Sequence, residues 1–271
     1  MGDALRAKGL DLPEALVFGL GAGLGFSLHD GDTRLRPPQP SRFFVGRSAT
    51  FERDLCNSVH ATLHEEHFVD RDSAFDHVEK LLDQRELPLV YTDLAELPYT
   101  HAHAHWFGHL VAVERIDTVW DNAYAEPQHI APEQLRRALC GPEPERGAGC
   151  TVLHVTGTPE APTQPTSAVD LQRRRMRADL PAIRELAREL PRWRQKPDWE
   201  RIARLAGQVI EVRGTGGGLF RRMYAQFLHD AGFAEMAMLC KEAADAWTEL
   251  TRSPDAEHAL ACAEAEEALW G

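Results

Sequence analysis

The chain has 271 residues, 43% of them hydrophobic and 27% charged, a composition typical of a soluble globular protein with one or two domains. Its net charge of −12, from 42 acidic against 30 basic residues, argues against nucleic-acid binding. No apolar run approaches the roughly 20 residues needed to cross a bilayer, and the N-terminus has no signal-peptide pattern. We therefore expect a cytoplasmic protein without a membrane partner.

The first half of the chain mixes helix and strand signals. In 73–84, apolar residues at positions 75, 78, 81 and 82 form the stripe of an amphipathic helix, and a β-rich run follows it. A helix followed by several strands with short turns predicts an α+β domain with an antiparallel sheet. The expected strands cover 87–94, 110–116, 117–124 and 150–155, and a second short helix covers 131–139.

The second half is rich in Ala, Leu, Glu and Arg and has few breakers, which predicts an all-helical domain. Before it, TGTPEAPTQPTSAVD has three prolines, five Thr or Ser residues and no apolar periodicity, as expected of an exposed connection. We therefore expect an α+β domain over 1–157, a linker over 158–177 and a helical domain over 178–271. The expected helices of the last cover 179–191, 198–210, 219–231, 233–250 and 255–269.

The cysteines follow no metal-binding or redox spacing. They include no CxxC pair, so in a reducing cytosol all five are expected to be free and structural. They are Cys56, Cys140, Cys150, Cys240 and Cys262. This spacing excludes a cysteine-rich zinc site, and no cofactor is expected.

Four of the 13 histidines gather in HAHAHWFGH, residues 101–109. On an extended strand His101, His103 and His105 would share one face, with neighbours roughly 7 Å apart, and neutral imidazoles bind zinc, copper or nickel. No HExxH motif accompanies them, and a catalytic zinc site normally adds a ligand from another element. A polar loop before a buried strand is the simpler interpretation, so no bound metal is expected here.

His109 differs from the other three because it follows a glycine and directly precedes the strand-like LVAV. Twelve residues later, Asp121 stands in VWDN on the next expected strand. Two antiparallel strands joined by a short turn would bring these side chains together, and an aspartate beside a histidine fixes the tautomer needed in a general base. A core histidine and an unrelated turn aspartate explain the spacing equally well.

Several stretches, taken in order, resemble a known family. They are ALR…GLDLPEALVFGLGAGLGF (4–26), DLAELPY (93–99), HWFGHLVAVERID (105–117) and VWDN (119–122). Together they are similar to the N-terminal domain of the butirosin-biosynthesis acyltransferase family, which implies a papain-like cysteine-enzyme fold related to bacteriocin-processing peptidases. EVRGTGGGLFRRMYAQFL (211–228) resembles the helical domain that often follows it.

The resemblance implies covalent acyl transfer. In such enzymes a cysteine attacks a carbonyl or thioester, a histidine carries its proton, and an Asp or Asn orients the histidine. The butirosin enzyme itself moves an acyl group from a carrier-protein thioester onto an amine of an aminoglycoside. By this match His109 takes the histidine role and Asp121 the orienting role, with Asn122 as a weaker alternative.

The nucleophile is where the sequence departs from the family. The family's cysteine lies at the N-terminus of the first helix, where the helix dipole and the nearby imidazolium lower its pKa, but GDALRAK contains no cysteine. The match gives Cys56 no catalytic place. Three explanations stay open: the cysteine lies upstream of Met1, the His109–Asp121 pair promotes direct aminolysis of a thioester, or the protein is inactive and binds a partner.

Two glycine-rich stretches are candidate binding loops. FGLGAGLGF fits a nucleotide-binding GxGxG weakly, because no βαβ context surrounds it. By the resemblance, its Gly21 and Gly23 lie in a tight loop whose backbone amides approach substrate. In TGGGLFRR, Gly216 and Gly217 directly precede an expected helix whose N-terminus would face an anion. A flexible turn is the plainer interpretation of the second stretch.

Two further features concern substrate and partners. Asp93 and Tyr99 occupy matched family positions and are expected to line the substrate cleft, although Tyr99 fits a core position equally well. LQRRRMR (171–177) places four arginines together in an acidic chain. Such a run suits an acidic carrier protein and the phosphate of its arm, or simply a solvated helix end.

The sequence thus favours an acyltransferase or amide synthase of natural-product, such as antibiotic, biosynthesis. The enzyme would join an acyl group, held as a thioester on an acyl carrier protein, to a small amine. A peptidase or amidase, with water in place of the amine, is the rival enzyme, and an inactive binding or scaffold protein is the alternative without catalysis. The oligomeric state is open, a homo-oligomer included.

Overall fold

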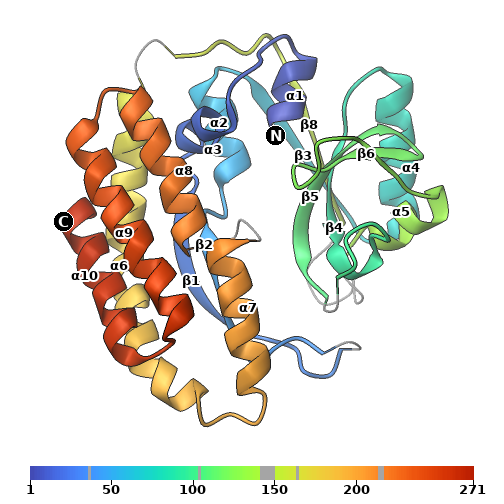
Figure 1. Ribbon diagram of the computed structural model, residues 1–271. Helices are drawn as coiled ribbons and strands as arrows, with labels where there is room; N and C mark the ends of the chain where they lie inside the picture. Colours follow the sequence, from blue (N-terminus) through green and yellow to red (C-terminus); the bar gives the residue numbers. More distant parts are fainter. Residues whose placement is uncertain (36–37, 103–104, 141–149, 163–164, 213–216) are drawn as a thin grey trace. The chain divides into compact units, whose positions relative to one another are not determined.

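The computed structural model is an α+β protein with antiparallel sheets, as the sequence predicts (Figure 1). It describes residues 1–35, 38–102, 105–140, 150–162, 165–212 and 217–271. The chain forms two compact units, each assembled from three separate segments. Unit 1 comprises Met1–Leu12, Arg34–Gln39 and His60–Glu160, and unit 2 comprises Pro13–Thr33, Pro40–Val59 and Ala161–Gly271.

Unit 1 contains a sheet in which six strands of the described chain pair antiparallel in the order β3–β8–β4–β5–β6–β7. Its strands are β3 (Thr62–Phe68), β4 (Leu89–Asp93), β5 (Phe107–Arg115), β6 (Thr118–Trp120), β7 (Gln128–His129) and β8 (Cys150–Thr156). Its helices are α1 (Gly2–Ala7), α4 (Arg71–Asp83), the 3-10 helix η1 (Leu94–Glu96) and α5 (Pro132–Ala138).

Helix α4 supplies one side of the core of unit 1. Asp70 caps its first turn by accepting a hydrogen bond from the Ser73 N–H at 2.7 Å. A buried apolar stripe then recurs at helical spacing and joins Val90, Val111 and Val152 of the sheet in one core. The stripe consists of Ala74, Phe75, Val78 and Leu81.

Unit 2 joins helices to a two-stranded sheet of β1 (Leu24–Asp30) and β2 (Arg42–Arg47). The Gln172 side chain fastens α6 to β1, because it accepts from the Leu24 N–H at 2.9 Å and donates to the Leu24 carbonyl at 2.8 Å. The helices are α2 (Glu14–Leu20), α3 (Phe51–Ser58), α6 (Thr166–Trp193), α7 (Trp199–Glu211), α8 (Gly217–Asp230), α9 (Ala234–Arg252) and α10 (Ala256–Trp270). In the described part of the chain, no helix has the length and apolar character required to cross a membrane.

The segment expected to be a linker is largely helical. Helix α6 begins at Thr166, and its first turns bury Ala168, Val169 and Met176. Three prolines precede these buried residues, so the sequence showed no clear helical periodicity there. The units also differ from the expected boundary near residue 157, because unit 2 takes two of its segments from before residue 60.

Cys140 and Cys150 form a disulfide bond, which corrects the expectation that all five cysteines are free. Their Cα atoms lie 4.5 Å apart, within the range that a disulfide bond spans. A separation of 10 residues carries no signature that the sequence alone would reveal. Cys56, Cys240 and Cys262 are free and buried.

A buried polar network centred on Glu266 connects three helices of unit 2. Arg221 of α8 and Glu266 of α10 are both inaccessible to solvent, and the guanidinium binds the carboxylate. Glu266 also accepts hydrogen bonds from the indole N–H groups of Trp247 in α9, at 2.9 Å, and Trp270, at 2.8 Å. One carboxylate therefore satisfies donors from α8, α9 and α10.

Replacing Glu266 with Gln should lower the free energy of unfolding by about 3–5 kcal/mol, because the Arg221 charge stays buried without a counter-charge. Urea unfolding followed by circular dichroism measures the change. Glu267→Gln is the matched control, since the neighbouring Glu267 pairs with Arg184 at the surface and exposed pairs contribute little. Equal losses in the two variants would contradict this account of the buried pair.

Candidate active site

His109 lies on β5 at the end of the core face of the sheet. Because side chains alternate along a strand, His109 shares its face with Val111 and Val113, which are buried in the core of unit 1. Gly108 before it has a φ of +122°, a conformation that residues with a side chain rarely adopt. The His109 side chain remains 19% exposed, so it is held by the core and reachable from solvent.

Asp121 directly follows β6, and its side chain is fully buried. Its Oδ2 lies 2.6 Å from Nε2 of His109. Its Oδ1 accepts the Ala123 N–H at 3.0 Å, and its carbonyl accepts the Tyr124 N–H, also at 3.0 Å. This turn ends β6 earlier than the expected strand and holds the carboxylate toward His109.

The pKa of Asp121 lies below its usual value. Burial alone raises it, but the hydrogen bond and the positive charge of His109, together with the Ala123 N–H, outweigh burial and lower the pKa. Asp121 is therefore an anion at neutral pH and accepts the Nε2 proton of His109. Among the described residues no hydrogen bond engages Nδ1, so Nδ1 is the nitrogen that can take up a proton.

Tyr99 packs beside this pair. Its ring meets Tyr124 edge-on with centroids 5.3 Å apart, and the Tyr124 hydroxyl donates to the Tyr99 carbonyl at 2.9 Å. Burial and the negative charge of Asp121 raise the pKa of Tyr99, so its hydroxyl stays protonated near the carboxylate. Tyr99 also packs against the core of unit 1, and thus belongs to both the core and the surroundings of the pair. Asn122 is exposed beside Asp121.

A second aspartate–histidine pair lies in the same unit and was not expected from the sequence. Nδ1 of His105 lies 2.5 Å from Oδ2 of Asp93, and Oδ1 of Asp93 accepts two backbone N–H groups, each at 3.1 Å. The side chains of His105 and Asp93 are only 9% and 2% exposed. Asp93 therefore serves to bind the backbone of the neighbouring segments, through the N–H groups of Ala95 and Trp106. The twelve-residue spacing, the same as that of His109 and Asp121, was the signal available in the sequence.

The other histidines of the 101–109 stretch are arranged differently. His101 is exposed and has a φ of +50°, and His103 lies outside the described residues. Within the described part of the chain, these histidines do not form a cluster of metal ligands with one another.

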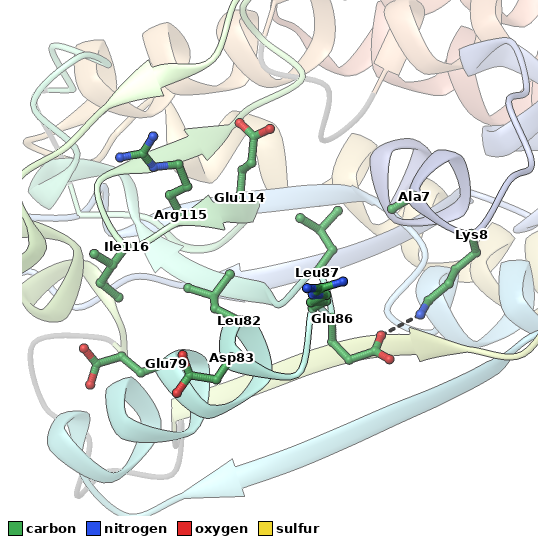
Figure 2. A pocket seen from close by; sticks show the side chains of 11 residues that line it. Ala7, Lys8, Glu79, Leu82, Asp83, Glu86, Leu87, Glu114, Arg115 and Ile116 are labelled. Carbon is green, nitrogen blue, oxygen red and sulfur yellow. Dashed lines mark hydrogen bonds and ion pairs between the residues drawn. The ribbon is translucent and has the colours of Figure 1, made fainter.

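A surface hollow of about 730 Å³ lies in unit 1 (Figure 2). Charged residues of both signs line it, among them Lys8, Glu86, Glu114 and Arg115. Lys8 pairs with Glu86 at 2.6 Å, as the dashed line in Figure 2 marks. Neither His109 nor its aspartate lines this hollow, so the hollow and the candidate base are separate features.

Gly21 and Gly23, expected to form a substrate loop, pack against aromatic rings in unit 2. A Cβ on Gly21 would lie 2.5 Å from the Phe51 ring, and one on Gly23 would lie 2.3 Å from the Phe18 ring. Close packing therefore accounts for both glycines. Their approach to a substrate stays a prediction.

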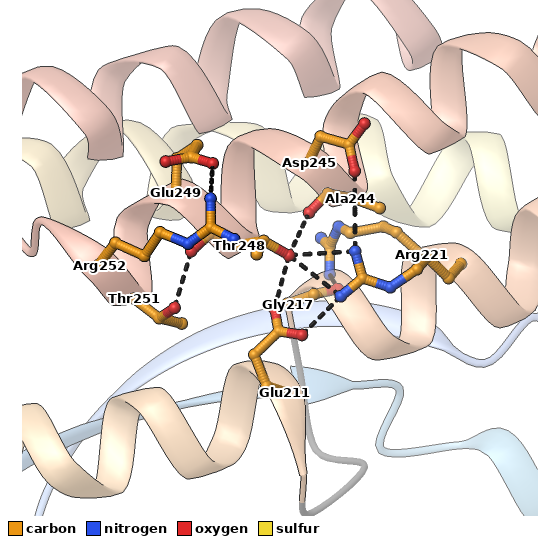
Figure 3. A network of polar contacts seen from close by, with 10 residues as sticks. Glu211, Gly217, Arg221, Ala244, Asp245, Thr248, Glu249, Thr251 and Arg252 are labelled. Carbon is orange, nitrogen blue, oxygen red and sulfur yellow. Dashed lines mark hydrogen bonds and ion pairs between the residues drawn. The ribbon is translucent and has the colours of Figure 1, made fainter.

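Gly217 is the first residue of α8, and Gly216 lies outside the described residues. Arg222, which follows them, binds Glu211 at 2.5 Å, and the Thr248 hydroxyl donates to the same carboxylate at 2.7 Å. Figure 3 shows this network around Thr248. The positive charge near the start of α8 is thus already balanced within unit 2, which weakens the case for an anion site there.

Two arginines of the LQRRRMR stretch also make contacts within unit 2. Arg175 lies 2.6 Å from Asp54, and Arg177 donates to the Trp270 carbonyl at 2.6 Å. The run offers a carrier protein less charge than its composition suggests, and docking there stays a prediction.

Comparison with protein families places the His109 pair in a known domain. Residues 1–124 match the family model described as butirosin biosynthesis protein H, N-terminal, and residues 137–268 match the one described as a domain of unknown function (DUF4872). The chain has a butirosin biosynthesis protein H-like N-terminal domain. This match confirms the resemblance inferred from the sequence. His109 and Asp121 both lie within the matched residues. The chain has no match among the curated proteins.

Asp121→Asn should lower the free energy of unfolding at pH 7 by about 1–3 kcal/mol, because a buried charged hydrogen bond is lost. The pKa of Asp121 is depressed in the folded state. Its contribution is therefore present above the unfolded value of about 3.9 and is lost as the pH falls through the lower folded value. Chemical unfolding at several pH values measures the difference. A deficit that stays constant down to about pH 2 would contradict the assignment.

Proposed function

We propose that the protein is an amide-forming acyltransferase of natural-product biosynthesis, with His109 as general base and Asp121 as its orienting partner. The proposal rests on the 2.6 Å contact between His109 Nε2 and Asp121 Oδ2 inside the butirosin biosynthesis protein H-like domain. The acyl donor would be a thioester, such as one on an acyl carrier protein, and the acceptor a small amine.

In this reaction His109 acts through Nδ1. The amine nitrogen attacks the thioester carbonyl carbon, and Nδ1 takes a proton from that nitrogen. The C–N bond forms, the C–S bond breaks, and the imidazolium returns the proton to the departing thiolate. Asp121, an anion at neutral pH, stabilises the imidazolium while it exists.

The cysteines of the chain are poorly suited to the nucleophilic role that the family resemblance implies. Burial raises the pKa of Cys56 to about 11 and raises the pKa of Cys240 and Cys262 as well. These thiols stay protonated at neutral pH, whereas a catalytic cysteine needs a lowered pKa. Cys140 and Cys150 are joined to each other. In our proposal for the residues of this chain, His109 deprotonates the acceptor amine directly.

A hydrolase is the second candidate, because the exposed part of His109 also gives water access to the base. Water would then replace the amine as the attacking group, and the same histidine and aspartate would serve. The two functions differ in product: an amide in one case and a free acid in the other.

Incubating the protein with an N-acetylcysteamine thioester and a panel of primary amines, aminoglycosides included, should yield amide detectable by mass spectrometry. His109→Ala should reduce the rate by about 10²–10⁴-fold, the usual contribution of a general base. Asp121→Asn should reduce the rate as well, because the imidazolium loses its counter-charge.

His101→Ala is the matched control, since His101 is an exposed histidine of the same stretch that lies outside the pair; its rate should equal that of the wild type. Free acid as the sole product would replace the proposal by the hydrolase. No product, even from an acyl group loaded on a carrier protein, would overturn both and favour a binding protein.

A further inference from the structure

Three metal-ligating side chains from separate elements converge in unit 1. Glu66 lies on β3, His77 on α4 and His154 on β8, and their ligand atoms all lie within 4.8 Å of one another. Pairing of β3 with β8 sets His64 opposite His154, and Glu66 lies two residues further along the same face. Helix α4 packs against both strands and brings His77 to the same place (Figure 1).

The separations within this group suit a small cation. Glu66 Oε1 lies 3.2 Å from His77 Nε2. Two ligands of a tetrahedral zinc ion, with bonds of about 2.0–2.1 Å, are about 3.3 Å apart. Even a separation at the 4.8 Å bound would have to close by only about 1.5 Å to reach that value, which side-chain rotation allows.

Two ring nitrogens at this place are buried without a hydrogen-bond partner among the described residues: His77 Nε2 and His154 Nδ1. Buried polar atoms nearly always have a partner, so each such atom calls for an explanation. Glu66 Oε1 and His77 Nε2 lie close to each other but do not satisfy hydrogen-bond geometry. A cation among the three side chains would satisfy both nitrogens and the carboxylate together.

The His154 ring packs against that of His64, the residue opposite it on β3. The two rings stack with centroids 4.5 Å apart and an interplanar angle of 9°. Nε2 of His64 lies 2.9 Å from the Thr156 hydroxyl, which fixes the His64 ring beneath that of His154.

We propose that Glu66, His77 and His154 bind one zinc ion, which ties the edge strand β3 to β8 and α4. Two imidazoles and a carboxylate are a known zinc ligand set and leave a fourth position for water. Calcium and magnesium prefer all-oxygen ligands, so the class of ion is zinc and its first-row neighbours. The Glu66 side chain is 46% exposed, which gives the ion a path of entry.

This zinc site is separate from the His109 pair. The sheet order puts β8 two strands and β3 three strands away from β5. At about 4.8 Å per strand, these strands lie roughly 10–14 Å from β5. The ion therefore stabilises the edge of the sheet and takes no part in proton transfer at His109.

Zinc titration of the full chain, after chelator treatment and dialysis, tests the site. Calorimetry and metal analysis should give one zinc per chain, and zinc, unlike magnesium, should raise the Tm. Glu66→Gln and His77→Ala should each weaken zinc binding by at least roughly 100-fold, the upper end of what the loss of an outer-shell partner costs. Glu66→Gln keeps the volume of a half-exposed side chain, so it tests ligation even where the His77 variant loses stability.

The control on the same strand is His67→Ala, because His67 lies on the other face of β3, with Nδ1 3.0 Å from the Thr151 hydroxyl. It should bind zinc as the wild type does. A His101→Ala/His103→Ala variant should also bind normally. The proposal is overturned if the wild type takes up no zinc at micromolar concentration, if Glu66→Gln binds as tightly as the wild type, or if only the double variant loses the ion.

Discussion

The pairing of β4 with both β5 and β8 is the interaction on which unit 1 depends. Leu89 of β4 lies opposite Ala112 on one side and Leu153 on the other, so the backbone of β4 is hydrogen-bonded on both edges. A slip of one residue in either pairing would turn every side chain of the slipped strand to the opposite face. The register of these two pairings therefore decides on which face of the sheet the side chains of His109 on β5 and His154 on β8 lie.

The two aspartate–histidine pairs show how environment gives the same two groups different capacities. Asp93 uses one oxygen for two backbone N–H groups and the other for His105, which is almost fully enclosed. Asp121 is equally buried, but its partner His109 keeps part of its ring open to solvent. A histidine that exchanges protons with a substrate must be reachable, so accessibility and not the carboxylate contact distinguishes the two.

Local signals predicted much of unit 1 and of the helical part of unit 2. The stripe of α4 and the strand-like run of β4 follow from residues close together in the chain, and so does the contact between His109 and Asp121 across one short turn. Contacts between distant segments were not predictable in this way. Gln172 is hydrogen-bonded to Leu24 although 148 residues separate them in the chain. The periodicity of neither segment predicts that the two are in contact.

The zinc ligands and the disulfide belong to this second class. Glu66, His77 and His154 come from three elements without a shared motif, and β3 is an edge strand whose side chains are mostly exposed, so its pattern lacks clean alternation. Periodicity reports which face of an element is buried. It does not indicate which other element covers that face. The zinc ligands and the disulfide come together only through contacts with such distant elements.

The segmented construction of unit 2 has a consequence for synthesis on the ribosome. Residues 13–33 and 40–59 emerge first, but the rest of unit 2 begins only at Ala161. The intervening residues 60–160 take roughly 5–20 s to translate at about 5–20 residues per second. During that interval Phe26 and Phe44 lack Trp247, against which both rings pack in the finished protein. The nascent chain therefore leaves these two rings uncovered by Trp247 until Trp247 itself has been translated, and unit 2 is not completed before then.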